Sequence, residues 1–266
     1  MEHYNKIDGA NFRFVLSSGR VGTTSLREYL KENTNDIDVA FEPKSSRPAF
    51  MLWNFEKYIK HNNNLSESYV IKQREKESLQ IKTGCTRVEI NPFLSPFCKV
   101  LSEHIKDMHV VHIIRHPYTW INSIMSFRAL GWRKHFIDSI PFTRLVHPAA
   151  VDCWSSLSEP EKFAWRWRLH NEQILEPVDE YTKYRLIKYE DLSLGTTEVR
   201  IQKLADVLEV LMPESNAIDI NINKLGKLNT SNSSTKPAFD SLPIDMRKKI
   251  HEICAPLMET FSYTDE

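Results

Sequence analysis

The chain has 266 residues, of which 41% are hydrophobic and 26% are charged, a composition typical of a globular protein with one large core. Its 35 basic and 35 acidic residues give a formal net charge of zero, so no overall positive charge favours a nucleic acid or an anionic membrane. No apolar run reaches the roughly eighteen residues of a membrane span, and the first residues lack a signal-peptide pattern. We therefore expect a soluble, cytoplasmic protein with neither kind of partner.

Four cysteines, Cys85, Cys98, Cys153 and Cys254, are widely spaced and form no C-x-x-C pair. This spacing argues against a zinc site and against a disulfide framework. A reducing compartment is the expectation, and no metal site is predicted.

The first predicted element is a strand at Phe12–Leu16 that leads through a glycine-rich turn into a helix starting at Thr23. Glycines let the backbone approach a ligand closely, and the free amides of a helix start attract negative charge. Arg20 adds a guanidinium with five donors. The glycine spacing is shorter than in a Walker A loop, and no lysine precedes the threonines. We predict an anion-binding loop formed by Ser18, Gly19, Arg20, Val21, Gly22, Thr23, Thr24 and Ser25.

Strands and helices alternate along the rest of the chain, which predicts an α/β fold with three layers, a central parallel sheet flanked by helices. No repeat or linker divides it, so residues 1–266 are expected to form one domain. Further strands are predicted at Ile37–Phe41, Leu79–Lys82, His109–Ile114 and Tyr184–Lys188. Helices are predicted at Thr23–Glu32, Pro48–Lys60, Ser95–Lys106, Trp120–Ala129, Pro160–Glu176, Val199–Leu208 and Pro243–Phe261.

Arg115 stands at the carboxyl end of the fourth predicted strand, just before the turn at Pro117. Ligands of open parallel sheets bind at this edge, so Arg115 and Arg20 are expected to face one crevice. Ser123 follows Arg115 by eight residues, which brings its hydroxyl back toward the guanidinium across the first helical turns. One arginine and one hydroxyl suit a phosphate monoester.

Two segments are expected to cover this crevice as lids or substrate loops. Residues 130–158 mix aromatic and charged side chains, and residues 221–242 contain the run NTSNSSTKPAF. Long irregular segments inside a compact domain are often binding loops. For the second segment, a plain surface connection is an equal alternative.

The loop GRVGTT together with RHP and Ser123 resembles the sulfotransferase superfamily that uses 3'-phosphoadenosine 5'-phosphosulfate (PAPS), in particular its branch with a G-R-x-G-T-T loop. The late strand YRLIKYEDL and the tail ICAPLMETFSY are similar to the same family, in the same order along the chain. The resemblance implies that the first loop holds the 5'-phosphosulfate, and that Arg115 and Ser123 hold the 3'-phosphate. It also implies a P-loop-like fold and the product 3',5'-adenosine bisphosphate (PAP).

The resemblance and the positions after strands point to further residues. Glu42 follows the second strand and is the candidate base, although it has the alternative of pairing with a basic neighbour. His112 and His116 are competing bases, but His112 lies within a strand, where a hydrogen-bonded core residue is expected, and His116 is expected to shape the turn before Pro117. The resemblance implies that Lys82 stabilises the leaving oxygen, although Gly84 and Cys85 replace the family's usual proline. Tyr189 is expected at the nucleotide. Two residues of the late loop, Ser231 and Lys236, are expected to extend the same site.

The predicted activity is sulfuryl transfer from PAPS to a hydroxyl or amine of a carbohydrate or small-molecule acceptor, in line, with Glu42, Lys82 and Arg20 as catalytic residues and no metal. An ATP-dependent small-molecule kinase is the alternative enzyme, but the Walker lysine and a carboxylate for magnesium are missing. A non-catalytic nucleotide-binding module is the third possibility. The oligomeric state is not predicted.

Overall fold

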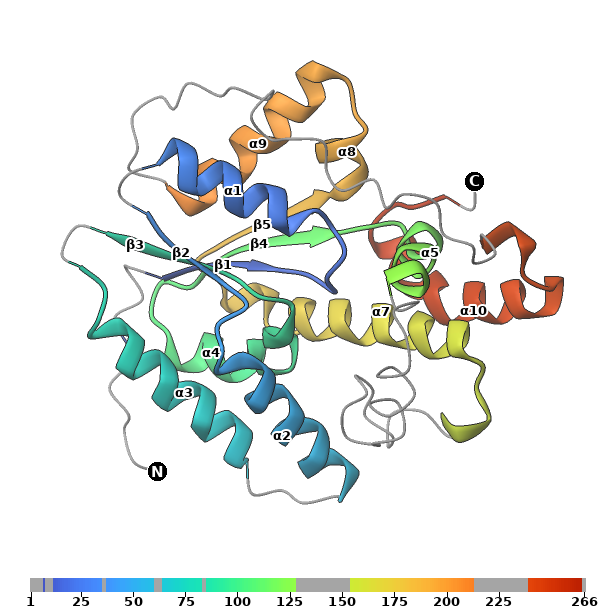
Figure 1. Ribbon diagram of the computed structural model, residues 1–266, viewed down its shortest axis with the longest axis horizontal. Helices are drawn as coiled ribbons and strands as arrows, with labels where there is room; N and C mark the ends of the chain where they lie inside the picture. The colour runs from blue at the N-terminus through green and yellow to red at the C-terminus, as the bar shows by residue number, and fades with distance from the viewer. Residues whose placement is uncertain are drawn as a thin grey trace.

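The computed structural model describes residues 7, 12–34, 37–59, 64–82, 85–127, 154–212 and 239–264. A five-stranded parallel sheet, in the order β2-β3-β1-β4-β5, forms the centre (Figure 1). The strands are β1 (Phe12–Leu16), β2 (Ile37–Phe41), β3 (Thr86–Ile90), β4 (His109–Ile114) and β5 (Lys183–Lys188). Most of the two predicted lid segments lies outside the described residues.

Helices cover both faces of this sheet, which confirms the predicted three layers (Figure 1). One face carries α1 (Thr23–Asn33) and α9 (Thr197–Leu211), with the short α8 (Tyr189–Ser193) nearby. The other face carries α2 (Ser46–Tyr58), α3 (Leu65–Ser78), α4 (Cys98–His104) and α7 (Glu159–Leu175). Near the carboxyl ends of the central strands lie α5 (Pro117–Phe127) and α10 (Ile244–Thr260). Short 3-10 helices are η2 (Pro92–Phe97), η5 (Trp154–Ser156), η6 (Val178–Glu180) and η8 (Phe239–Ser241).

The core has one part on each face of the sheet, because alternate side chains of a strand point to opposite faces. In β1, Phe12, Phe14 and Leu16 pack among the residues of α2, α4 and η2, whereas Val15 packs with those of α1 and α9. All five residues of β1 are buried. A strand covered on both faces reads as a continuous apolar run, which is why this strand was predictable.

The predicted strand at Leu79–Lys82 is wrong. The chain runs as α3 up to Ser78, turns at Leu79 and Gln80, and enters the sheet only at Thr86. Leu79 is 87% exposed, so its apolar side chain was a misleading signal. Helix α3 was missed because its sequence, LSESYVIKQREKES, is mostly polar and shows little helical periodicity of apolar residues.

All five carboxyl ends of the strands meet at one edge because every neighbouring pair is parallel. The glycine-rich loop follows β1, Glu42 follows β2, and η2 follows β3 by one residue. Arg115 follows β4, and Tyr189 follows β5. The topology thus brings residues from across the sequence to a single edge.

A buried polar network fixes the β3 end of this edge. Arg74 Nη2 of α3 donates to Glu89 Oε1 of β3 at 2.7 Å, and Asn91 Nδ2 lies 2.7 Å from the same oxygen and 2.6 Å from Ser46 Oγ. Burial raises the pKa of the Glu89 carboxyl, while Arg74 and the Asn91 bond oppose that rise. Asn91 Oδ1 accepts from the Phe93 amide at 2.9 Å, so the network joins α2 and α3 to the first turn of η2.

His112 is a fully bonded core residue of β4, as the sequence indicated. Its Nδ1 lies 2.9 Å from the Tyr184 hydroxyl and its Nε2 lies 2.8 Å from Asn171 Oδ1. Burial lowers the pKa of His112 to about 4, although the Asn171 bond opposes the shift. The folded protein therefore holds a neutral imidazole at a pH where an unfolded chain, with a pKa near 6.5, would bind a proton.

This depressed pKa makes stability depend on pH in a defined direction. The stability that comes from keeping His112 neutral is fully present above about pH 6.5 and is lost as the pH falls toward 4. The loss of unfolding free energy amounts to about 1.4 kcal/mol at pH 5.5. We expect urea unfolding to show that the wild type loses more stability between pH 7 and pH 5.5 than His112→Gln does. An equal loss in both proteins would show that His112 does not titrate as stated.

Candidate functional site

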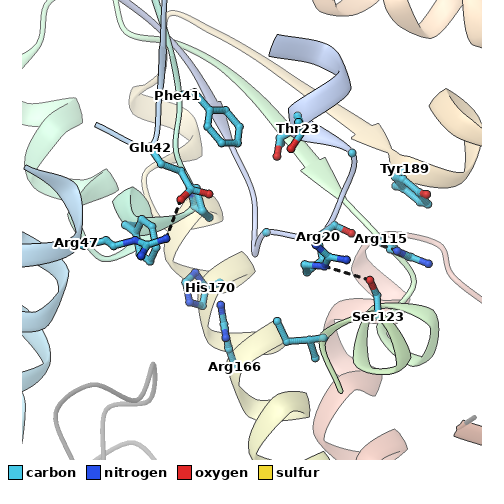
Figure 2. A pocket seen from close by; sticks show the side chains of 16 residues that line it. Arg20, Thr23, Phe41, Glu42, Arg47, Arg115, Ser123, Arg166, His170 and Tyr189 are labelled. Atoms are coloured by element: carbon cyan, nitrogen blue, oxygen red, sulfur yellow. Dashed lines mark hydrogen bonds and ion pairs between the residues drawn. The ribbon is translucent and has the colours of Figure 1, made fainter. Parts of the chain in front are cut away.

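A cavity of about 440 Å³ opens at the carboxyl edge of the sheet. Its walls come from the loops that follow β1, β2, β3, β4 and β5, and from α5 and α7 (Figure 2). The lining residues are Gly19, Arg20, Gly22, Thr23, Thr24, Phe41, Glu42, Arg47, Pro92, Phe93, Arg115, Ser123, Ile124, Arg166, His170 and Tyr189. The structure therefore brings together most of the side chains that the sequence pointed to, together with several that it did not.

The loop after β1 is shaped for a ligand by its backbone. Gly19 and Gly22 have φ of 81° and 78°, and Arg20 between them also has a positive φ, 57°. Side-chain-bearing residues rarely adopt this left-handed conformation, and they do so most often at functional sites. Trp120 Nε1 donates to the Gly19 carbonyl at 2.7 Å, so a buried indole from α5 holds the loop in place.

The start of α1 leaves backbone polar groups available to an anion. Helix α1 begins at Thr23 directly after Gly22, its first turn contains no acidic residue, and no side chain caps it. Its positive end is therefore not neutralised. Ser18 is completely buried, and within the described part of the chain its hydroxyl oxygen has no hydrogen-bond partner. Ser18 itself is not among the residues that line the cavity.

Two guanidinium groups meet on one side of the cavity (Figure 2). Arg115 Nη1 donates to the Arg20 carbonyl oxygen at 3.2 Å, and the Arg115 guanidinium stacks 4.5 Å from the centre of the Tyr189 ring. Burial lowers the pKa of Arg20, and the charge of Arg115 lowers it further. Burial also lowers the pKa of Arg115. Both side chains remain cations, and an anion between them would relieve their repulsion and replace lost hydration.

Other hydrogen bonds fix the positions of these two arginines and of the chain around them. Arg20 Nε donates to Ser123 Oγ at 3.3 Å, so the structure places this serine against Arg20 as well as beside Arg115. Trp167 Nε1 of α7 donates to the Arg115 carbonyl at 2.9 Å. Glu190 accepts from the His116 amide at 2.9 Å and from the Tyr263 hydroxyl at 3.0 Å. This carboxylate thereby ties α8 and the segment that follows α10 to the start of α5.

Glu42 lies on the other side of the cavity, in a second strained position. Its φ is 42°, and its amide donates to the Ile90 carbonyl at 3.0 Å, which fixes the turn after β2. Its carboxylate accepts from Arg47 Nη2 at 3.3 Å, and the Arg47 guanidinium lies 5.3 Å from the centre of the Phe93 ring. The alternative foreseen from the sequence, pairing with a basic neighbour, is thus present. Arg47 is 68% exposed, and exposed pairs of this kind are weak and easily rearranged.

Seven lining residues were not predicted as part of the site: Phe41, Arg47, Pro92, Phe93, Ile124, Arg166 and His170. Arg166 and His170 are one helical turn apart on α7. His170 is only 2% exposed, and Arg166 stacks 5.6 Å from the Trp120 ring. The signal available in the sequence was this i, i+4 pair of polar residues inside an otherwise tryptophan-rich helix.

Several predicted site residues lie elsewhere. Lys82 is exposed and precedes β3, so it enters the sheet region from the amino-terminal edge and is not among the residues that line the cavity. The physical reason is the misplaced strand, because a residue after a strand and a residue before it lie at opposite edges. Val21 is buried in the core, and Ser25 is half-buried within the first turn of α1. Ser231 and Lys236 lie outside the described residues.

Within the described residues, no group of three or more His, Cys, Asp or Glu side chains is arranged to hold a metal ion. None of the helices described combines the length and the apolar character needed to cross a membrane.

The Trp120 bond to Gly19 yields a test of the loop's geometry. Removing the indole N–H in Trp120→Phe leaves the Gly19 carbonyl without its partner, so the loop should hold an anion less firmly. We expect the dissociation constant for PAP, measured by calorimetry, to rise about tenfold. Trp165→Phe on the half-buried side of α7 is the control and should bind as the wild type does. If Trp120→Phe bound PAP as tightly as Trp165→Phe, the bond from Trp120 to Gly19 would not be needed for ligand binding.

Comparison with known proteins shows similarity at the level of the fold. No protein-family model matches the sequence, and no curated protein matches it either. Among solved structures, a sulfotransferase domain from the curacin biosynthetic pathway is similar over 98% of this chain and 99% of its own, with 16% identity and a TM-score of 0.51. A sulfotransferase from Alicyclobacillus acidocaldarius is similar over 96% of each chain, with 14% identity and a TM-score of 0.52. The chain therefore has the fold of sulfotransferase structures.

Proposed function

We propose that this protein is a sulfotransferase of the Arg-type branch, which transfers a sulfuryl group from PAPS to a hydroxyl or amine of a carbohydrate or small-molecule acceptor. The observation that carries the proposal is the convergence of Arg20 and Arg115, two partly buried guanidiniums at the carboxyl edge of the sheet. The sulfotransferase-like fold supports it. The cytoplasm remains the proposed compartment, and one domain the proposed organisation.

The residues present fit a nucleotide with phosphate groups at both ends of its ribose. The uncapped start of α1 and the turn at Gly19–Gly22 suit the 5'-phosphosulfate. Arg115 and Ser123 suit the 3'-phosphate, and Tyr189 already stacks on Arg115 beside it. When bound, PAPS would supply the sulfuryl group and a leaving oxygen on PAP.

Glu42 is the proposed general base. The acceptor O–H proton passes to the Glu42 carboxylate while the acceptor oxygen bonds to sulfur. The bond between sulfur and the bridging oxygen breaks, and that oxygen keeps the electron pair on PAP. Arg47 holds the Glu42 carboxylate before the acceptor enters, and because this arginine is largely exposed it can swing away at little cost. With Lys82 not among the residues that line the cavity, the loop after β1, Arg20 included, would supply the donors to the leaving oxygen.

Selective binding of PAP tests the nucleotide assignment. We expect PAP to raise the melting temperature more than ADP or AMP does, because only PAP fills the proposed 3'-phosphate site. Arg115→Ala should lose most of this selectivity, whereas Arg185→Ala, an exposed arginine of the neighbouring strand β5, should keep it. Stabilisation by ADP that equals or exceeds that by PAP would favour the kinase alternative. Tight PAP binding without release of PAP from PAPS would favour the non-catalytic module.

The proposed base makes a separate prediction. Glu42→Gln should bind PAP almost as tightly as the wild type but release PAP from PAPS at least about a hundredfold more slowly, because an amide cannot take the acceptor proton. Glu28→Gln, an exposed carboxylate on α1, is the control and should retain full activity. If Glu42→Gln lost binding and turnover together, Glu42 would be acting on the nucleotide and not as the base.

A further inference from the structure

His170 occupies an unusual position in the wall of the cavity. It projects from α7 and is 2% exposed, and its ring stacks on Phe50 of α2 with centroids 6.0 Å apart. Its Nδ1 lies 2.6 Å from Ser95 Oγ of η2. The ring is therefore held from two sides, and it lies in the cavity wall near Arg166 (Figure 2). Phe93 also lines the cavity.

The other ring nitrogen of His170 has no partner. Within the described part of the chain, Nε2 is buried and forms no hydrogen bond. The contrast with His112 is informative, because both ring nitrogens of that equally buried histidine are bonded. A buried polar atom without a partner costs free energy, so a protein that retains one at the wall of a ligand cavity has a use for it there.

The hydrogen-bond network assigns the proton to Nε2. If Nδ1 carried the proton and donated to Ser95, the serine hydroxyl proton and the Nε2 lone pair would both be unsatisfied. If the Ser95 hydroxyl donates to Nδ1, only the Nε2–H group lacks a partner. The second arrangement leaves fewer buried groups unpaired, so the group of His170 that lacks a partner is an N–H donor, on a residue that lines the cavity.

The surroundings of this donor favour an oxygen with negative charge as its partner. Burial, and after it the charge of Arg166, keeps the pKa of His170 well below its usual value, so the imidazole stays neutral and does not add a cation to the cavity. Among the described residues, the charged groups of the cavity wall are Arg20, Arg47, Arg115 and Arg166 against the single carboxylate of Glu42. A neutral N–H donor beside Arg166 is suited to a partly charged oxygen.

Helix α7 also packs beside η2, which lies next to the anion-binding loop. Helix η2 begins with Pro92, whose Cβ is 3.7 Å from where a side chain on Gly19 would start. Trp167, on the same helix, bonds the Arg115 carbonyl. The helix that carries His170 therefore contacts the Arg115 side of the cavity directly, and it packs against η2, which lies next to the loop.

We propose that His170 is a further catalytic residue, donating its Nε2–H to an oxygen of the sulfuryl group during transfer. This inference rests on the proposed function. It gives the sulfuryl group a donor on the side of the cavity where the sequence offered none, since Lys82 lies at the other edge of the sheet.

Two substitutions separate this role from a structural one. His170→Asn keeps a polar group near the Nδ1 position, facing Ser95, and removes the one at Nε2. His170→Gln does the reverse and returns an amide near the Nε2 position. His112→Gln, at a buried histidine away from the cavity lining, controls for the loss of a core imidazole.

The measurement is PAP release from PAPS with 4-nitrophenol as acceptor, and with water when no acceptor is added, alongside calorimetric binding of PAP. We expect His170→Asn to lower kcat about tenfold with PAP affinity and acceptor KM unchanged, the effect of one lost hydrogen bond in the transition state. His170→Gln should retain several-fold more activity than His170→Asn. His112→Gln should lower the melting temperature without lowering kcat.

Three results would overturn the proposal. Wild-type activity in His170→Asn would remove the role of Nε2, and higher activity in His170→Asn than in His170→Gln would make the Ser95 contact the important one. A raised KM for 4-nitrophenol at unchanged kcat would move the contact from the sulfuryl group to the acceptor. If the wild type itself neither binds PAP nor releases it from PAPS, the proposed function fails and this inference falls with it.

Discussion

The candidate site depends on two guanidinium groups that the fold holds together against their mutual repulsion. Arg20 and Arg115 come from loops after adjacent strands, and one donates to the backbone carbonyl of the other at 3.2 Å. No attraction between the two side chains explains this arrangement. Neutral contacts maintain it instead, through the indole bonds of Trp120 and Trp167 to the backbone carbonyls of Gly19 and Arg115. Because these two bonds fix the backbone of each loop, the side chains of Arg20 and Arg115 remain in the wall of the cavity.

Two parts of the molecule outside the sheet complete the site. Helix α7 supplies Arg166 and His170 to the cavity and Trp167 to the Arg115 loop. The buried network of Arg74, Glu89 and Asn91 fixes the start of η2, which in turn carries Phe93 and Ser95. The side of the cavity with Glu42 therefore depends on packing from α2, α3 and α7, whereas the side with Arg20 depends on the sheet edge and α5. This division matches the proposed roles, with the nucleotide on the side of Arg20 and the acceptor on the side of Glu42.

Each of the two sides of the cavity has one residue with a strained backbone, Arg20 on one side and Glu42 on the other. Arg20 and Glu42 have positive φ angles and follow β1 and β2, and each lies at the turn where its strand leaves the sheet. Left-handed backbone at side-chain-bearing residues costs of order 1 kcal/mol each and persists where the surroundings impose it. In the case of Glu42, the surrounding bond is that of its amide to the Ile90 carbonyl of β3. The strain keeps the carboxylate at the edge of the sheet, facing Arg47.

The sequence by itself determined the strand–turn–helix units at Phe12–Asn33 and His109–Phe127, because a continuous apolar run followed by glycines or proline has few other structures available. It also placed Arg20, Glu42, Arg115 and Tyr189 after strands, and parallel pairing then brings such residues to one edge. Only the tertiary structure decided which polar residues of α7 face the cavity and on which side of β3 Lys82 lies. The facing of the α7 residues depends on how that helix is buried, and the position of Lys82 depends on where β3 begins. A polar segment with weak periodicity, such as α3, gives no local signal of either.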